Sequence, residues 1–233
     1  MPAFSAFCII AAGGSGDRLG SSIAKFELPV LGRPMVRFSL EAFEQAGRIA
    51  GIVLVVPPDR VDDWTPSRLR ASGISKSLAT IAGGATRQES VRLGLGAIEG
   101  TGDVVVVHDA ARPLVTAEII DAMCDIPAGM AGLVTAVPVT DTIKQAERGS
   151  VVKTLDRDEY IAVQTPQSFA LTALVEAHGE AVRTGFAGTD DSSLVERMGG
   201  RVGLMNGSRE NIKVTYPVDV VMAEAILKER GKR

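Results

Sequence analysis

Short apolar runs rich in valine and isoleucine alternate along this chain with segments of helical periodicity, and this alternation narrows the possible folds more than any other feature. The apolar runs cover residues 7–12, 52–56, 78–82, 104–107 and 133–137. After the first run, Val36, Leu40 and Phe43 follow the i, i+4, i+7 spacing that places side chains on one face of a helix. Apolar strands joined by helices are typical of a parallel sheet covered on both faces. We therefore predict an α/β fold with a mostly parallel sheet.

Composition limits the class of protein. The 233 residues, 45% apolar and 23% charged, suffice for one core, so residues 1–233 are expected to form a single domain. A net charge of −3 argues against general binding to nucleic acid or to an anionic membrane. We find neither a signal-peptide pattern nor an apolar stretch near the roughly 20 residues of a membrane span. Cys8 and Cys124 read as buried apolar residues, and we expect a cytoplasmic protein.

A glycine-rich segment follows the first apolar run. Glycines there let backbone N–H groups approach anionic oxygens that a β-carbon would keep away. Arg18 and Lys25 then add positive charge. The segment predicts a site for the phosphates of a nucleotide. The backbone expected to line it belongs to Ala12, Gly13, Gly14, Ser15 and Gly16.

Three other kinds of site do not fit this loop. A P-loop needs Gly-Lys-Ser or Gly-Lys-Thr, whereas this chain has Gly16-Asp17-Arg18. A dinucleotide fold wants an acidic residue at the end of the second strand, which here ends in Val56-Pro57-Pro58. The sequence shows neither metal-ligand spacing nor the Gly-x-Ser-x-Gly elbow of a serine hydrolase, so no protein-held metal is predicted.

The fourth apolar run leads into His108-Asp109-Ala110-Ala111-Arg112-Pro113. Ligands of open parallel sheets bind beyond the carboxyl ends of the strands, so this loop should face the ligand. Asp109 has three open roles: binding a ribose hydroxyl, holding a hydrated Mg²⁺, or orienting a substrate hydroxyl. Arg112 would hold a phosphate or fix the loop through a carboxylate. For His108 we favour a structural loop histidine bonded to backbone over proton transfer.

The third apolar run leads into Gly83-Gly84-Ala85-Thr86, followed by a helical pattern. Thr86 stands where a helix cap is expected, which explains part of the motif. The two glycines would also let backbone N–H and C=O groups read the edge of a flat base, with Ser90 adding a side-chain hydrogen bond. Capping and base binding both remain open on this motif alone.

The second half of the chain departs from the alternation. At about 138–160, polar and apolar residues alternate around Arg148-Gly149-Ser150, which predicts a hairpin arm. A two-stranded arm is marginally stable alone, so we expect it to pack on a second copy in a homodimer. Residues 164–167 precede a return to helical patterns. Lys213 is expected in a short strand at 210–215, and Val218, Val221, Met222 and Ala225 on the core face of a last helix.

Five motifs in order along nearly the whole chain carry a family resemblance: residues 12–18, Lys25, 108–113, Thr-Pro-Gln at 165–167 and Asn-Ile-Lys-Val-Thr at 211–215. Together they resemble the 2-C-methyl-D-erythritol 4-phosphate cytidylyltransferases. The resemblance implies a nucleotidyltransferase-type, Rossmann-like fold with an arm that clasps a second subunit. It implies transfer of CMP from CTP to the sugar-alcohol phosphate, with release of pyrophosphate, in the methylerythritol route to isoprenoids. Mg²⁺ would be held mainly by the CTP phosphates.

The resemblance also implies residue roles. Arg18, Lys25 and Lys213 match the cations that bind the CTP phosphates and stabilise charge on the α-phosphate. Gly84 and Ser90 match the cytosine readers, and Asp109 and Arg112 match positions near the ribose and the acceptor. Ala110 joins the nucleotide-binding positions. Acceptor-site positions match Thr142, Arg157 and Thr165, with Arg157 reaching the partner's site from the arm.

Two departures and two rival functions qualify the resemblance. Ala24-Lys25-Phe26 replaces the usual Pro-Lys-Gln, and Ala85 stands where some members have an aspartate beside the base. The ribitol 5-phosphate cytidylyltransferases share the fold and most motifs but tend to carry valine at the position of Ala111. A non-catalytic nucleotide-binding regulator is disfavoured by the retained Arg18 and Lys25.

Overall fold

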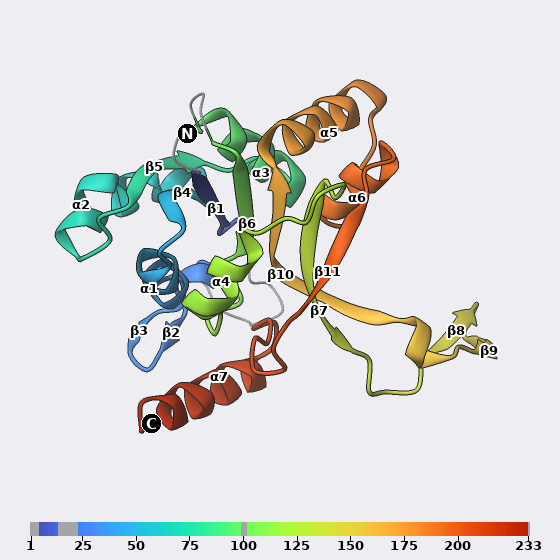
Figure 1. The fold of residues 1–233 in the computed structure, drawn as a ribbon. Helices are drawn as coiled ribbons and strands as arrows, with labels where there is room; N and C mark the ends of the chain where they lie inside the picture. Colours follow the sequence, from blue (N-terminus) through green and yellow to red (C-terminus); the bar gives the residue numbers. More distant parts are fainter. Residues whose placement is uncertain (1–4, 14–22, 99–101, 233) are drawn as a thin grey trace.

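A seven-stranded sheet forms the centre of the molecule, in the order β11-β7-β10-β6-β1-β4-β5 (Figure 1). The computed structural model describes residues 5–13, 23–98 and 102–232. The strands are β1 (Ala6–Ala11), β4 (Ile49–Val56), β5 (Ser77–Ala82), β6 (Val104–Asp109), β7 (Gly132–Pro138), β10 (Ile161–Ala170) and β11 (Val202–Asn206). All neighbouring pairs are parallel except those of β10, which runs antiparallel to β6 and β7. The predicted mostly parallel α/β sheet is confirmed.

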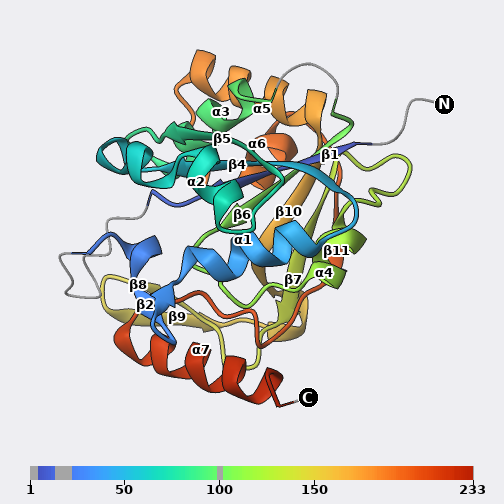
Figure 2. The same cartoon turned by 90° about the vertical axis from the view of Figure 1, so that its left-hand side faces the viewer.

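Helices cover both faces of this sheet, as predicted (Figure 2). One face packs on α1 (Val36–Gln45), α2 (Pro66–Ala71) and α4 (Ala117–Met123). The other packs on α3 (Arg87–Gly96), α5 (Leu171–Thr184) and α6 (Asp191–Arg197). Alternate residues of β1 show why two layers form: Cys8 and Ile10 belong to the first core, and Ile9 to the second. Two-sided burial explains the continuous apolar runs.

Short elements complete the first half of the chain. They are the 3-10 helices η2 (Lys25–Glu27) and η3 (Pro58–Trp64) and the strands β2 (Pro29–Val30) and β3 (Arg33–Pro34), which pair with each other. Lys25 of η2 lines the same pocket as Ala11 at the end of β1. No helix in the described ranges is long and apolar enough to cross a membrane.

The predicted hairpin arm is present. It consists of β8 (Lys144–Glu147) and β9 (Ser150–Thr154), followed by the 3-10 helix η4 (Arg157–Glu159), and it projects away from the sheet (Figure 1). Arg148 and Gly149 both have positive φ, 48° and 80°, as the tight turn of a hairpin requires. Val151 and Val152 are exposed on the arm, so the described chain leaves apolar side chains there in solvent.

Two expectations for the C-terminal region are wrong. Residues 210–215 form no strand; two local turn bonds, a backbone bond from the Val214 N–H to the Ala111 carbonyl, and side-chain bonds hold them. The last helix, α7 (Pro217–Arg230), does form, but its expected core face is exposed at Val218, Val221, Met222 and Ala225. Apolar residues occur all around this helix, so periodicity selects no face. Its packing face instead contains Val220, Ala223, Ile226 and Leu227.

Candidate active site

A pocket of about 250 Å³ lies at the carboxyl ends of β1 and β6, where the parallel-sheet rule places a ligand. Its described lining comes from the end of β1, η2, the start of α3, the end of β6 and the segment before α7. The lining residues are Ala11, Ala12, Gly13, Lys25, Phe26, Arg87, Ser90, Asp109, Ala110, Ala111 and Lys213. Seven predicted site residues are thus brought together: Ala12, Gly13, Lys25, Ser90, Asp109, Ala110 and Lys213. Gly14, Ser15, Gly16 and Arg18 lie outside the described residues.

The Asp109 carboxylate is held between two cations. Its Oδ1 accepts a hydrogen bond from Arg87 Nε at 2.8 Å, and its Oδ2 accepts one from Lys213 Nζ at 2.7 Å. Burial alone would raise the pKa of Asp109, but the charges of Arg87 and Lys213 outweigh it and hold that pKa well below its ordinary value. The carboxylate is therefore ionised at neutral pH.

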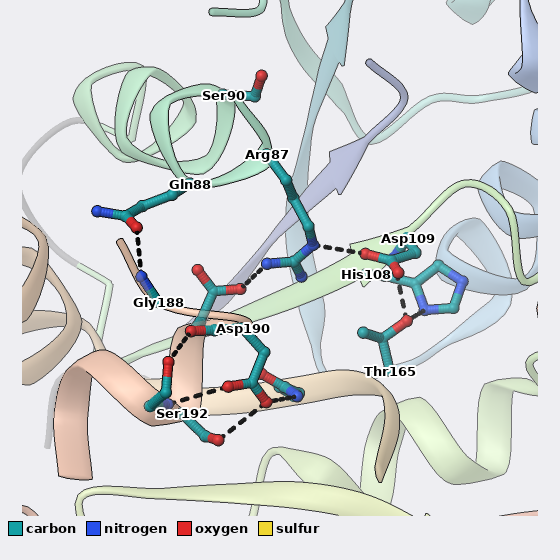
Figure 3. A network of polar contacts seen from close by, with 12 residues as sticks. Arg87, Gln88, Ser90, His108, Asp109, Thr165, Gly188, Asp190 and Ser192 are labelled. Atoms are coloured by element: carbon teal, nitrogen blue, oxygen red, sulfur yellow. Dashed lines mark hydrogen bonds and ion pairs between the residues drawn. The ribbon is translucent and has the colours of Figure 1, made fainter. Parts of the chain in front are cut away.

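Arg87 is a functional-site residue that sequence reasoning did not single out. Its Nη1 donates to Asp191 Oδ2 at 2.7 Å, while its Nε holds Asp109. Asp191 is buried, and its other oxygen lies 3.1 Å from Nε2 of buried His178. Figure 3 shows Arg87 descending from the first turn of α3 towards Asp109. The signal was present, because Arg87 directly follows the predicted helix cap, but the motif alone does not reveal a partner 104 residues away.

Thr165 and His108 form the buried support behind Asp109. The Asp109 N–H donates to Thr165 Oγ1 at 3.0 Å, and this hydroxyl lies 3.2 Å from His108 Nδ1 (Figure 3). His108 Nε2 lies 3.1 Å from the carbonyl oxygen of Arg112. An Nε2–H donating to that carbonyl leaves Nδ1 to accept from Thr165, which satisfies all these groups. Desolvation by burial lowers the pKa of His108 to about 4, so the ring is neutral at pH 7.

Arg112 fastens loops rather than facing the pocket. Its Nη1 donates to the Asn211 carbonyl at 2.8 Å and its Nη2 to the Val163 carbonyl at 3.4 Å. Of the two open roles for this side chain, these bonds match loop fixing, although the partners are backbone carbonyls and not the expected carboxylate. The buried Asn211 amide in turn donates to the Thr165 carbonyl at 2.8 Å. These bonds hold the segment before α7 against β10, which places Lys213 at the pocket.

The expected base-binding loop packs on the start of α3. Ser90 Oγ accepts from the Gly84 N–H at 3.1 Å and donates to the Thr86 carbonyl at 2.9 Å. Thr86 caps the helix by accepting from the Glu89 N–H, as predicted. A β-carbon added at Gly84 would come within 2.4 Å of three atoms of the Glu89 side chain, whose Oε2 accepts from the Ala85 N–H. A side chain at position 84 would therefore require the Glu89 side chain to move.

Thr142 and Arg157 do not reach this pocket within the chain. Thr142 is exposed between β7 and β8, and Arg157 Nη1 donates to the Thr140 carbonyl at 2.8 Å. Both lie on the projecting arm region, outside the described lining of the pocket. These two expected acceptor-site residues therefore do not line the pocket of their own chain.

Comparison with known proteins decides the family. A family model described as 2-C-methyl-D-erythritol 4-phosphate cytidylyltransferase matches residues 6–229. The chain belongs to this family. A relative of that name from Geobacter metallireducens is 40% identical over 227 residues, covering 96% of this chain and 98% of the relative. One from Bacillus velezensis is 42% identical over 221 residues, with 94% of each chain covered. The resemblance inferred from the sequence is confirmed.

Solved structures of cytidylyltransferases have the same fold. The Thermus thermophilus 2-C-methyl-D-erythritol 4-phosphate cytidylyltransferase aligns with a TM-score of 0.76 at 31% identity, over 95% of this chain and 98% of that one. The 4-diphosphocytidyl-2C-methyl-D-erythritol synthase of Anaerococcus prevotii aligns with a TM-score of 0.82 at 27% identity, over 97% and 98% of the two chains. The nucleotidyltransferase-type fold is therefore confirmed.

Proposed function

We propose that this chain transfers CMP from CTP to 2-C-methyl-D-erythritol 4-phosphate, forming 4-diphosphocytidyl-2-C-methyl-D-erythritol and pyrophosphate in the methylerythritol route to isoprenoids. The observation that carries the proposal is family membership over residues 6–229. The pocket supports it, because Lys25, Arg87 and Lys213 bring positive charge to one place beside the Gly13 backbone. Such a site suits a ligand with several phosphates.

The chemistry needs positioning more than proton transfer. The acceptor phosphate is ionised at pH 7, so its oxygen attacks the α-phosphorus of CTP in line, and pyrophosphate leaves. Lys25, Lys213 and Arg18 neutralise charge on the phosphates in the transition state. Asp109 is held ionised by its two cations and is suited to orienting hydroxyl groups of the ribose or acceptor.

The remaining site roles belong to the same proposal. Backbone groups of Ala12, Gly13, Gly14, Ser15, Gly16 and Ala110 surround the nucleotide. Gly84 and Ser90 position the backbone that reads cytosine, since the Ser90 hydroxyl is bonded to the Gly84 N–H and to the Thr86 carbonyl. Arg112 and Thr165 hold the backbone around the acceptor site, through bonds to the Asn211 carbonyl and the Asp109 N–H. Thr142 and Arg157 serve an acceptor site from the arm.

Mg²⁺ enters with the nucleotide in this proposal. Both oxygens of Asp109 are engaged by Arg87 and Lys213, and the described residues contain no group of three or more His, Cys, Asp or Glu side chains able to hold a metal ion. These residues do not build a protein cage for Mg²⁺. The CTP phosphates would supply most of its ligands, and the bound ion would neutralise phosphate charge.

A homodimer through the arm completes the proposal. The arm at about 138–160 exposes Val151 and Val152, at 62% and 54%, and carries Arg157 away from the pocket of its own chain. A second copy would cover the valines and receive Arg157. We interpret residues 1–233 as one domain bearing this arm. The two buried free cysteines fit a reducing, cytoplasmic location.

Pyrophosphate release tests the proposed function. The purified chain is incubated with Mg²⁺ and CTP, together with 2-C-methyl-D-erythritol 4-phosphate, D-ribitol 5-phosphate or no acceptor. Release with the first acceptor alone is expected. Release with ribitol 5-phosphate alone would identify the chain as a ribitol 5-phosphate cytidylyltransferase. No release with either acceptor would reject the proposed transferase activity.

A further inference from the structure

Four charged side chains of alternating sign form a continuous row that ends at the pocket. Asp191 pairs with Arg87, Arg87 with Asp109, and Asp109 with Lys213, at 2.7, 2.8 and 2.7 Å. Asp191 begins α6, Arg87 begins α3, Asp109 ends β6, and Lys213 precedes α7. The first member of the row is the most buried and the last is the most exposed, since the side chain of Asp191 is 1% exposed and that of Lys213 is 46% exposed.

Arg87 is the member whose geometry is most constrained. Its Nε and Nη1 each bond a different carboxylate, which an ammonium group on a flexible stem reproduces poorly. Its Nη2 is buried and has no hydrogen-bond partner within the described chain. The bonds that fix the Arg87 guanidinium are thus those to the Asp109 and Asp191 carboxylates.

Asp191 is itself held firmly. Gln88, next to Arg87, accepts from the Gly188 N–H at 2.9 Å and donates to the Phe186 carbonyl at 3.1 Å. Asp190 caps α6 and accepts from the Ser192 hydroxyl at 2.9 Å (Figure 3). These bonds fix the segment before α6 against α3. The Asp191 carboxylate that pairs with Arg87 is therefore held in a fixed position relative to α3.

We propose that Arg87 and Asp191 are positioning residues of the transferase site, which act by holding the Asp109 carboxylate, and through it Lys213, in the orientation that the reaction needs. The inference rests on the proposed function. Asp191 balances the charge of Arg87, so that the buried guanidinium stays between the two carboxylates. A small displacement of Asp109 is expected to slow turnover, because misplacement by about 1 Å can cost about 10²-fold in rate.

A double-mutant cycle on the complete enzyme tests this inference. Steady-state pyrophosphate release is measured for wild type, Arg87→Ala, Asp109→Asn and the double variant, with CTP and 2-C-methyl-D-erythritol 4-phosphate. Arg87→Ala is expected to lower kcat/KM by about 10²-fold. Because Arg87 acts through Asp109, the double variant should fall within about twofold of Asp109→Asn alone. Arg92→Ala, an exposed arginine of the same helix, is the matched control and should keep wild-type kinetics.

Two further variants separate positioning from folding. Asp191→Asn keeps the shape of the side chain and removes its charge, and Arg87→Lys keeps the charge and loses the fork. Each substitution alone should lower kcat/KM by about tenfold or more. Combined with Asp109→Asn, it should change kcat/KM little relative to Asp109→Asn alone. Thermal unfolding reports the fold of each variant. If Arg87→Ala does not fold, the cycle of Asp191→Asn with Asp109→Asn decides the question.

The outcomes distinguish the inference from the function on which it rests. Losses that multiply in the double variants, or wild-type kinetics for Arg87→Lys and Asp191→Asn, would overturn the positioning role while leaving an active transferase. Lower thermal stability with unchanged kcat/KM would show a purely structural role and overturn it too. Wild-type protein without turnover would reject both claims.

Discussion

Asp109 Oδ2 lies 2.7 Å from Lys213 Nζ, although 104 residues separate them in the chain. This ion pair joins the end of β6 to the segment before α7, and it places Lys213 in the pocket that Lys25 also lines. On the sequence, a lone lysine near the C-terminus reads most simply as a solvated side chain. Its position at the expected phosphate site supports the catalytic role proposed for it.

The first prediction concerns the phosphate cations. Lys25→Ala should lower turnover by about 10²-fold or more, because it removes a preorganised positive charge from the transition state. Arg18→Ala is expected to do the same by the family resemblance. Pyrophosphate release measures the effect, and Lys228→Ala, an exposed lysine on α7, is the control. Near wild-type turnover of Lys25→Ala would contradict the assigned role.

Thr165 gives the second prediction. Thr165→Val should destabilise the protein by about 1–3 kcal/mol, because it leaves the Asp109 N–H without its acceptor in a buried place. Thr165→Ser should restore most of the free energy of unfolding. Urea unfolding at pH 7 measures both variants. Equal stability of the valine and serine variants would show that the hydroxyl is not required there.

His108 gives a pH-dependent prediction. Burial lowers its pKa to about 4 in the folded state, whereas an unfolded histidine has a pKa near 6.5. Between these values the unfolded chain binds more protons, so stability attributable to His108 falls as the pH decreases from 7 towards 4. From pH 7 to pH 5 the loss should be about 2 kcal/mol.

Comparison with a variant isolates this contribution from other titrating groups. The free energy of unfolding of wild type and of His108→Gln is measured by urea titration at both pH values. The wild-type value should decline more steeply by about 2 kcal/mol. If the free energy of unfolding falls equally in wild type and His108→Gln, the pKa of His108 is the same in the folded and unfolded states, which would contradict the prediction.

The sequence predicted those strands whose burial leaves a continuous apolar run, and it did not predict strands with polar or exposed residues. Strands such as β1 and β6 were recognisable because two-sided burial leaves continuous apolar runs. Strand β10 was missed because it carries buried polar residues, including Gln164, Thr165 and Gln167, which hide a strand from a hydrophobicity pattern. Edge strand β11 was missed as well, since residues such as its Leu204 are exposed.

In the candidate site, residues of local motifs could be predicted from the sequence, and residues whose partners are distant in sequence could not. Glycines and cations near one loop, such as Gly13 and Lys25, form local motifs and were predicted. Arg87 and Asp191 were not, because their roles come from ion pairs between elements distant in sequence. Neither residue has a local signature that separates it from helix-terminal polar residues. Such networks depend on tertiary structure.

Gly84 allows a matched pair of glycine substitutions. Gly84→Ala should raise the KM for CTP severalfold, because the added β-carbon displaces the Glu89 side chain, which accepts a hydrogen bond from the Ala85 N–H of the same loop. Gly96→Ala, at the end of α3, meets open space and should keep wild-type kinetics. Initial rates over a range of CTP concentrations decide between them. An unchanged KM for Gly84→Ala would remove this loop from the proposed nucleotide site.

The arm gives the last of these predictions. Val151→Lys combined with Val152→Lys should shift the protein from dimer to monomer, because both valines would be buried in the proposed interface. Val182→Lys, an equally exposed valine on α5, is the control. Sedimentation velocity measures the oligomeric state. A wild-type monomer, or a dimer unaffected by the arm substitutions, would contradict dimerisation through the arm.

The central claim is that the acceptor phosphate attacks the α-phosphorus of CTP, and an oxygen label tests it most directly. 2-C-Methyl-D-erythritol 4-phosphate labelled with ¹⁸O in its phosphate is incubated with the enzyme, CTP and Mg²⁺, and the products are followed by ³¹P NMR. We predict a diphosphate product in which all the label is retained, one labelled oxygen bridging the two phosphorus atoms, together with unlabelled pyrophosphate. Formation of CDP or inorganic phosphate in place of pyrophosphate would contradict the account.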